Sequence, residues 1–387
     1  MSGDANEALL ALEDGWSAVG RPVGAPGTTT GEFVFNTCLS GYQEVLTDPS
    51  YSGQIVVMTY PLIGNYGIVH EDDESDAPQV EGFVMRRCVR EPSSWRADEA
   101  LPDWLRRHGV VAIEGVDTRA LTRRLRTRGA LRGVITTEAM EPHEAVQRAR
   151  KVPPMTGRDL TGAVTCEAPR VEGEGRWSVA AWDFGMKRNI VRRLVAGGCR
   201  VERYPAETPP EAILEREPDG LFVSNGPGDP AATERAIASL RRVGELAPGL
   251  PTFGICLGHQ LLALAHGGET YKLKFGHHGG NHPVQDLRTG HIDITSHNHG
   301  FAVREGRDRR PGGRGESRRI VAGAPELEIT HVNLYDGTVE GFRHVERPLF
   351  AVQYHPEAAP GPHDARHHFA DFVAAIRARS EGGAGRS

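Results

Sequence analysis

The chain has 387 residues, which is long enough for two domains, each with its own hydrophobic core. Hydrophobic residues make up 39% and charged residues 25%, with a formal net charge of -6, as in ordinary soluble globular proteins, so no general attraction to nucleic acid is expected. The N-terminal sequence MSGDANEALLALEDG carries acidic residues where a signal peptide carries basic ones. No apolar run approaches the roughly 18 residues that span a bilayer, so we expect a cytoplasmic protein without a membrane segment.

The cysteines argue against a disulfide framework and against a thiolate zinc site. Their number is odd, they are widely spaced, and no two of them form a C-x-x-C pair. This use of cysteine is typical of the reducing cytoplasm. The five positions are Cys38, Cys88, Cys166, Cys199 and Cys256.

Residues 1–150 are expected to form an N-terminal mixed α/β domain. Short apolar stretches bounded by turn residues predict strands at 31–37, 54–60 and 109–115. Residues 117–129 predict a short basic helix, with Asp117 as its N-cap and Gly129 as its stop. The five arginines of this helix either face water or form a surface for a partner.

The rest of the chain predicts a different architecture. Residues 151–173 lack periodicity and are rich in Pro, Gly and charges, as expected of a linker. Residues 174–380 alternate strand and helix patterns, which predicts βαβ units and an open, mostly parallel α/β sheet. Segments beyond Tyr271 look antiparallel, with a hairpin turn at Asp336-Gly337, and residues 381–387 are expected to be a disordered tail.

Residues 304–319, REGRDRRPGGRGESRR, form an Arg/Gly-rich stretch without an apolar anchor. Such composition predicts a mobile loop. A basic loop could bind phosphate or RNA, but a solvated loop is the better interpretation in a chain that is acidic overall.

Cys256 is the candidate nucleophile. It lies between Gly254 and Gly258 in GICLG, directly after an apolar strand pattern and directly before a helix pattern. This is the cysteine version of the G-x-S-x-G nucleophile elbow, in which glycines permit a tight turn. The helix N-terminus favours the reactive thiolate, and the amide of Leu257 is placed to stabilise an oxyanion. The other four cysteines lack this setting and are expected to pack in the interior.

His355 is the candidate base, in the segment AVQYHPE. Glu357 follows two residues later, so the strand period of two puts both side chains on one face, where the carboxylate can orient the imidazole. Cys256, His355 and Glu357 would then form a catalytic triad.

The segment SNGPGDP, at 224–230, ends another predicted strand. Its rigid turn could supply a second oxyanion donor from Gly228, or it could be a plain turn. A phosphate-binding loop is not supported, because no Lys and Ser/Thr follow.

Histidines cluster in three places, at 274–283, at 296–300 and near the C-terminus at His363, His367 and His368. No nearby carboxylate completes a known ligand spacing, and the last three histidines are expected on an amphipathic surface helix. We therefore expect no metal site.

The assembled motifs resemble a known family. SNGPGDP, GICLGHQ and YHPE are similar to class I glutamine amidotransferases, which have an open α/β sheet. The subfamily resembled is the small subunit of carbamoyl-phosphate synthase, through KFGHHGGNHPV, SHNHGFAV, WDFGMKRNI, FNTCLSGYQEVLTDPSYSGQIVVMTYPLIGNYG and VAIEGVDTRALTRRLRTRG. The resemblance runs from about 8 to 378 and is interrupted by the stretch 304–319.

The resemblance implies roles for individual residues. Cys256, His355 and Glu357 would be the catalytic triad, with Gly228 and Leu257 lining the oxyanion hole. The residues implied to hold glutamine are Ser50 in the first domain and Gly226, Gly228, Leu257, Gln260, Asn298, Gly300 and Phe301 in the second. Backbone amides and carbonyls of glycine-flanked turns suit an amino-acid substrate.

The resemblance also implies a partner. Ammonia released from glutamine would pass through an internal tunnel to a large subunit, which would bind ATP and metal ions and make carbamoyl phosphate for arginine and pyrimidine synthesis. No cofactor is expected in this chain, which has no P-loop.

Three other functions remain open. The chain could supply ammonia to a different synthase, such as one making GMP or anthranilate, although the motifs before residue 150 argue against this. It could be a catalytically silent scaffold, although both Cys256 and His355 are present. It could also be a general cysteine peptidase or hydrolase, which peptide and ester substrates would test.

Overall fold

The computed structural model describes residues 7–308 and 318–384. The chain divides into two compact units. The first comprises the described residues up to Thr156, together with Lys274–Gly279 and Ala359–Gly361; the second comprises Gly157–Leu273, Gly280–Ala358 and the described residues from Pro362 onward.

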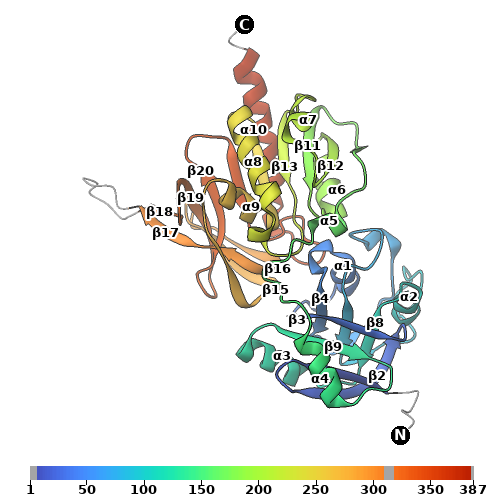
Figure 1. Cartoon of the computed structure of the whole chain (residues 1–387). Coiled ribbons are helices and arrows are strands. Elements are labelled where there is room, and N and C mark those ends of the chain that lie inside the picture. Colours follow the sequence, from blue (N-terminus) through green and yellow to red (C-terminus); the bar gives the residue numbers. More distant parts are fainter. Residues whose placement is uncertain (1–6, 309–317, 385–387) are drawn as a thin grey trace. The chain divides into compact units, whose positions relative to one another are not determined.

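The first unit is a closed β-barrel with helices packed around it (Figure 1). In barrel order its strands are β1 (Ala8–Leu12), β2 (Ser17–Gly24), β8 (Val111–Glu114), β6 (Gly82–Met85), β4 (Gln54–Met58), β3 (Thr28–Asn36) and β9 (Leu131–Thr136). The remaining elements are α1 (Tyr42–Thr47), α2 (Leu101–Arg107), α3 (Thr118–Arg128), α4 (Pro142–Arg150), the 3-10 turns η1 (Pro49–Tyr51) and η2 (His70–Asp72), and the two-stranded sheet of β5 (Leu62–Ile63) and β7 (Arg87–Cys88). The expected mixed α/β domain is confirmed, and β3, β4 and β8 cover most of the predicted strands.

Both faces of the barrel strand β4 are buried. On β4, Ile55 and Val57 join one apolar cluster, while Val56 and Met58 join another that also holds Trp104 of α2. The period of two along a strand explains this division.

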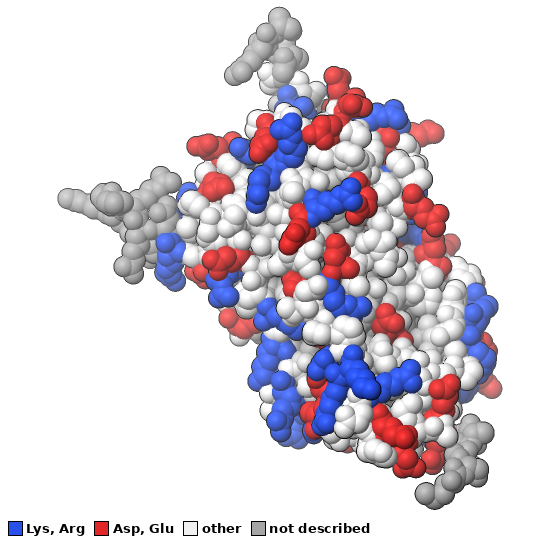
Figure 2. Space-filling model, in the orientation of Figure 1, with Lys and Arg blue, Asp and Glu red and all other residues white. Residues whose placement is uncertain are grey.

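Helix α3 forms where the sequence predicts it. The Asp117 side chain accepts a hydrogen bond from the Ala120 amide at 2.9 Å, which caps the helix, and Gly129 follows its last turn with a φ of 105°. Leu121 and Leu125 are buried, whereas most of the arginines are exposed. Figure 2 shows basic side chains gathering over the part of the first unit that carries this helix.

The second unit is built on one large sheet. Its order is β10 (Arg170–Glu172), β12 (Cys199–Pro205), β11 (Trp177–Asp183), β13 (Gly220–Val223), β14 (Thr252–Ile255), β21 (Leu349–Val352), β20 (Val339–His344), β19 (Ala324–Asn333), β15 (Thr270–Asp286) and β16 (Ile292–Val303), with β17 (Glu305–Asp308) and β18 (Arg318–Val321) attached to β19. The run from β12 to β21 is parallel, and the strands beyond it are antiparallel. The expected open α/β sheet is therefore confirmed, with an antiparallel extension that includes the hairpin turn at Gly337.

Helices cover both faces of the parallel strands (Figure 1). On β13, Leu221 and Val223 pack with α7, α8 and α9 on one face, while Phe222 packs with α6 and α10 on the other. The bounds are α5 (Thr161–Val164), α6 (Arg188–Ala196), α7 (Pro210–Leu214), α8 (Glu234–Leu246), α9 (Leu257–Ala265) and α10 (His367–Ala384), with 3-10 turns η3 (Pro230–Ala232) and η4 (Asp364–Arg366).

The segment predicted as a linker, 151–173, is largely part of the second unit. The division falls between Thr156 and Gly157, and β10 pairs antiparallel with β12. A three-residue strand at a sheet edge carries too little periodicity to be recognised from sequence.

Two segments that the sequence predicts to be mobile or disordered are partly ordered. Within the stretch 304–319, Glu305–Asp308 and Arg318 onward form the hairpin of β17 and β18, and residues 309–317 lie outside the described residues. At the C-terminus, α10 continues through residues 381–384, and residues 385–387 lie outside the described part.

Across the described residues, no helix combines the length and the apolar character needed to cross a membrane.

Candidate active site

Cys256 lies at a sharp turn between β14 and α9. It is the N-cap residue of α9 and has φ 54° and ψ -104°, a conformation that non-glycine residues rarely adopt. Its thiol is buried and donates to the carbonyl oxygen of Asn298, with Sγ to O at 3.5 Å. Strain of this kind persists where the surrounding structure fixes it, and it is concentrated at functional sites.

The two flanking glycines are required by close packing. A Cβ at Gly258 would lie 2.2 Å from the carbonyl oxygen of Val223, and one at Gly254 would lie 2.6 Å from Cδ1 of Leu262. At Gly258 the obstacle is a backbone oxygen, so the turn requires a residue without a side chain there, as the sequence motif predicts; at Gly254 a side chain would displace Leu262.

His355 follows β21, the strand next to β14 in the sheet. Its amide donates to the carbonyl oxygen of Ser296 at 2.8 Å, which fixes the backbone. Its Nδ1 lies 2.6 Å from Oε1 of Glu357, and both side chains are buried. The predicted contact between imidazole and carboxylate is present, and it leaves Nε2 as the nitrogen able to exchange a proton with a reacting group.

Electrostatics favour the charged forms of this pair. Burial alone would lower the pKa of His355, but the Glu357 carboxylate and the neighbouring Cys256 thiol outweigh it and raise the pKa from 6.5 to about 10. Burial alone would raise the pKa of Glu357, but the Lys187 ammonium and His355 lower it from 4.5 to about 2. An imidazolium beside a buried thiol can serve as a proton donor.

Lys187 and Asn189 support Glu357, and sequence reasoning assigned no role to either. The Nζ of Lys187 lies 3.0 Å from Oε1 of Glu357 and donates to the carbonyl oxygen of Ala358 at 2.7 Å. The Asn189 side-chain amide donates to the carbonyl oxygen of Glu357 at 2.6 Å. The available signal was a lysine and an asparagine at the start of the amphipathic helix α6, inside the quoted motif WDFGMKRNI.

Several residues predicted to bind glutamine lie close together in the second unit. The Gln260 side-chain amide donates to the carbonyl oxygen of Phe301 at 2.7 Å and to Oε1 of Gln353 at 2.9 Å. A Cβ at Gly226 would lie 2.8 Å from Cδ2 of Leu257, whereas a Cβ at Gly300 would meet nothing within 4 Å. The surroundings of Gly300 therefore leave room for a ligand.

The loop that carries Gly226 and Gly228 is held by the start of the second unit. Asp159 forms an antiparallel bridge with Gly228, and the Asp229 amide donates to the carbonyl oxygen of Arg158 at 2.8 Å. A Cβ at Gly228 would lie 2.6 Å from that same carbonyl oxygen. The segment predicted as a linker thus fixes the predicted oxyanion loop.

Ser50 belongs to the first unit, where it lies in the turn η1. Its amide donates to the Asp48 side chain at 2.9 Å, and the residue is buried. Its role in holding glutamine stays a prediction.

The histidines depart from expectation in two ways. His368 lies on the helix α10 as expected, but its side chain is buried, with its Nε2 2.7 Å from the Tyr354 hydroxyl, and His363 precedes η4 instead of lying on α10. In addition, His297 and His299 lie close to Glu340, so a carboxylate distant in sequence joins two histidines. Spacing along the sequence indicates only carboxylates close to the histidines in the chain, and Glu340 is not one of them.

The chain matches two protein families. Residues 10–135 match the family described as carbamoyl-phosphate synthase small chain, CPSase domain, and residues 180–375 match glutamine amidotransferase class-I. The second match contains Cys256, His355 and Glu357.

Proteins from other organisms that carry the name carbamoyl phosphate synthase small chain are similar to this chain over nearly its whole length. The protein from Syntrophotalea carbinolica is 50% identical over 382 residues, covering 95% of this chain and 97% of the relative. The protein from Thermotoga maritima is 50% identical over 388 residues, covering 96% and 98%. The protein from Thermosynechococcus vestitus is 51% identical over 387 residues, covering 96% and 97%.

Proposed function

Because the chain belongs to the carbamoyl phosphate synthase small-chain family and is a glutamine amidotransferase, we propose that it hydrolyses L-glutamine through a γ-glutamyl thioester on Cys256. The observation that carries this proposal is the strained, buried Cys256 at the β14–α9 turn, in the same unit as the His355–Glu357 pair. The proposed products are glutamate and ammonia.

In the first half of the proposed reaction, the Cys256 thiolate attacks the side-chain amide carbon of glutamine. The C–N bond breaks, and the His355 imidazolium gives its proton to the departing nitrogen, which leaves as ammonia. The raised pKa of His355 supports its charged form at neutral pH. The amides of Leu257 and Gly228 are the proposed donors to the oxyanion, each worth about 3 kcal/mol in the transition state.

In the second half, the neutral His355 takes a proton from water, whose oxygen attacks the thioester carbon. The C–S bond breaks, glutamate leaves and the thiolate–imidazolium pair is restored. Glu357 keeps one imidazole tautomer through both steps, since its carboxylate accepts from Nδ1 at 2.6 Å.

The proposal extends to a partner. We infer that the ammonia passes to a carbamoyl-phosphate synthase large subunit, which would bind ATP and metal ions and make carbamoyl phosphate for arginine and pyrimidine synthesis. The names of the relatives support this partner, and the motifs before residue 150 support it over other synthases. The five cysteines, all free, support a cytoplasmic setting.

The test measures glutamate release from glutamine by the full chain, alone and with the large subunit. We expect Cys256→Ser to lower the rate by more than about 1,000-fold, because the nucleophile is lost. Cys88→Ser, which also changes a buried cysteine, is the matched control and should keep the wild-type rate.

A second reaction separates hydrolysis from assembly. With the large subunit, the Cys256→Ser chain should support carbamoyl phosphate synthesis from added ammonia but not from glutamine. Glutamate release that survives Cys256→Ser would remove this cysteine from the mechanism. Hydrolysis without any response to the large subunit would point to a different partner.

A further inference from the structure

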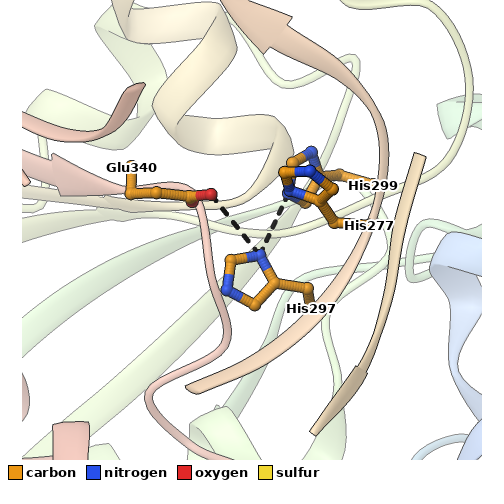
Figure 3. Close-up of side chains that lie close together, drawn as sticks. All are labelled: His277, His297, His299 and Glu340. Atoms are coloured by element: carbon orange, nitrogen blue, oxygen red, sulfur yellow. Dashed lines mark hydrogen bonds and ion pairs between the residues drawn. The ribbon is translucent and has the colours of Figure 1, made fainter. Parts of the chain in front are cut away.

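A second group of chemically active side chains lies apart from the catalytic triad. His297 and His299 are two residues apart on β16, and Glu340 lies on β20. All three are at least nine-tenths buried. Figure 3 shows their side chains pointing toward one another and also labels His277 of β15. We call His297, His299 and Glu340 the β16–β20 cluster.

Hydrogen bonds determine which imidazole nitrogens carry protons. The Thr295 hydroxyl uses its single proton to donate to the carbonyl oxygen of His282 at 2.9 Å. The hydroxyl oxygen also lies 2.7 Å from Nε2 of His297, so in this second hydrogen bond Nε2 must be the donor and carry a proton. Nδ1 of His299 lies 2.8 Å from the carbonyl oxygen of Phe301, so it also carries a proton. In their neutral forms, both rings therefore have their lone pairs on the other nitrogen.

These two lone pairs face each other. Nδ1 of His297 and Nε2 of His299 are 3.1 Å apart, and Oε1 of Glu340 lies 3.8 Å from the same Nδ1. Two lone pairs at this separation repel unless a cation or a proton lies with them. The buried carboxylate adds negative charge at the same point, which favours a cation.

We propose that the β16–β20 cluster binds a divalent transition-metal ion of the zinc type. Bonds of about 2.0–2.2 Å to nitrogen and oxygen in a tetrahedral site place ligand atoms about 3.3 Å apart, close to the separations here. Two imidazoles and one carboxylate suit zinc better than the oxygen-seeking Mg²⁺ or Ca²⁺.

The surrounding hydrogen bonds favour a metal over a shared proton. Ligating histidines almost always donate their second N–H to an oxygen, and ligating carboxylates are themselves hydrogen-bonded. His297 donates to Thr295, His299 donates to Phe301, and Glu340 accepts from the Asn333 side-chain amide at 2.9 Å. Each of the three ligands is thus already oriented.

The location of the cluster gives the ion a structural consequence. His297 and His299 flank Asn298, whose carbonyl oxygen accepts from the Cys256 thiol. A metal bound to both histidines would hold this part of β16 rigid, although no triad residue would be one of its ligands.

The test is zinc binding by the full chain, prepared free of metal with a chelator. Elemental analysis after removal of loose metal should find about one zinc ion per chain, and calorimetric titration should give its Kd. His297→Gln and Glu340→Gln should lose this ion. Cys256→Ser and His367→Gln should retain it, which excludes the nucleophile and the second histidine group of His367, His368 and Asp371.

A milder variant covers the case in which a ligand substitution prevents folding. Asn333→Ala leaves all three ligands in place and should weaken zinc binding about 10- to 100-fold, as expected for loss of an outer hydrogen bond. The proposal is overturned if the wild-type chain binds no zinc at stoichiometric level, or if the ion survives His297→Gln. It is equally overturned if Cys256→Ser loses the ion. Nuclear magnetic resonance of the metal-free chain gives a further test: a proton shared by the His297 and His299 rings that added zinc does not displace would also overturn the proposal.

Discussion

Three buried ionisable side chains next to Cys256 contact one another in a row. Lys187 contacts Glu357, and Glu357 contacts His355, both through the same carboxylate oxygen. A buried ion pair contributes little net stability when complete, but removing one partner leaves an uncompensated charge. Lys187 is therefore a positioning residue whose loss acts through Glu357.

A double-mutant cycle tests this role. Lys187→Met should lower the free energy of unfolding by up to about 3–5 kcal/mol, because the buried Glu357 carboxylate loses one of its two positive partners and keeps only His355. Adding Glu357→Gln should recover most of that loss, since both charges are then absent. Chemical denaturation of the single and double variants measures the coupling, and strictly additive losses would show that the two groups do not interact.

The dependence of stability on pH follows from the two shifted pKa values. Glu357, lowered from 4.5 to about 2, stabilises the fold above pH 4.5, and this contribution disappears as the pH falls through 2. His355, raised from 6.5 to about 10, stabilises the fold below pH 6.5, and this contribution disappears as the pH rises through 10. Both contributions are complete only between pH 4.5 and 6.5.

We expect the difference in thermal midpoint between wild type and Glu357→Gln to be largest in that window and to shrink toward both extremes. Thermal unfolding across the pH range measures it. The exposed Glu211→Gln is the control and should show no alkaline component. A difference that does not vary with pH would mean that the pair does not titrate as described.

At the scale of single residues, the sequence predicted the His355–Glu357 contact and the sharp turn at Cys256, but not the side chains that support Glu357. Cys256 and His355 are marked by local motifs, because a tight turn and a strand end constrain the neighbouring residues. Lys187 and Asn189 are 170 and 168 positions before Glu357, and nothing local ties a lysine to so distant a carboxylate. For the same reason Glu340 was missed as a neighbour of His297.

At the scale of elements, the junction of β14 and α9 needs glycine because there is no room for a side chain, and not because glycine is flexible. Gly258 packs against the backbone of β13, whereas Gly300 faces open space. Replacement by alanine should therefore destabilise the fold at Gly258 but not at Gly300.

Gly258→Ala should lower the free energy of unfolding by about 1–3 kcal/mol or more, because its Cβ would lie 2.2 Å from a carbonyl oxygen. Gly300→Ala should leave stability nearly unchanged and raise the KM for glutamine, if Gly300 lines the glutamine pocket as predicted. Denaturation and glutaminase kinetics on both variants measure this. Equal destabilisation by the two substitutions would contradict the packing argument.

The elements predicted well are those that carry strong local signals. Helix α3 has both an N-cap and a glycine stop, and the central parallel strands β13 and β14 are short, fully buried and mostly apolar. The elements that the sequence did not predict are mostly polar segments: β10, the hairpin of β17 and β18, and the last turn of α10. Strand pairing, rather than composition, orders the first two, and a single sequence does not reveal pairing partners.

At the scale of the whole molecule, neither unit is continuous in sequence. Lys274–Gly279 and Ala359–Gly361 belong to the first unit although they lie beyond residue 270. The Thr37 amide donates to the carbonyl oxygen of His278 at 3.2 Å, and the Ala130 amide donates to that of Lys274 at 2.9 Å. A boundary drawn from composition alone assigns both short segments to the second unit, because Lys274–Gly279 lies within β15 and Ala359–Gly361 is only three residues long.

This discontinuity predicts that residues 1–156 are incomplete as a separate domain. Without Lys274–Gly279, Phe35 loses its stacking with Phe275 and Tyr51 loses its stacking with His278. With the two backbone hydrogen bonds, the loss should be about 3–5 kcal/mol, taking about 1 kcal/mol for each hydrogen bond and about 0.5–1.5 kcal/mol for each ring pair. The fragment should therefore unfold at lower temperature than a version carrying residues 272–281 on a flexible linker. A peptide of those residues should raise the thermal midpoint of the bare fragment with the logarithm of the peptide concentration once this exceeds its Kd, whereas a peptide with Phe275→Ala should raise it less. A bare fragment as stable as the linked version would mean that the barrel is complete without this segment.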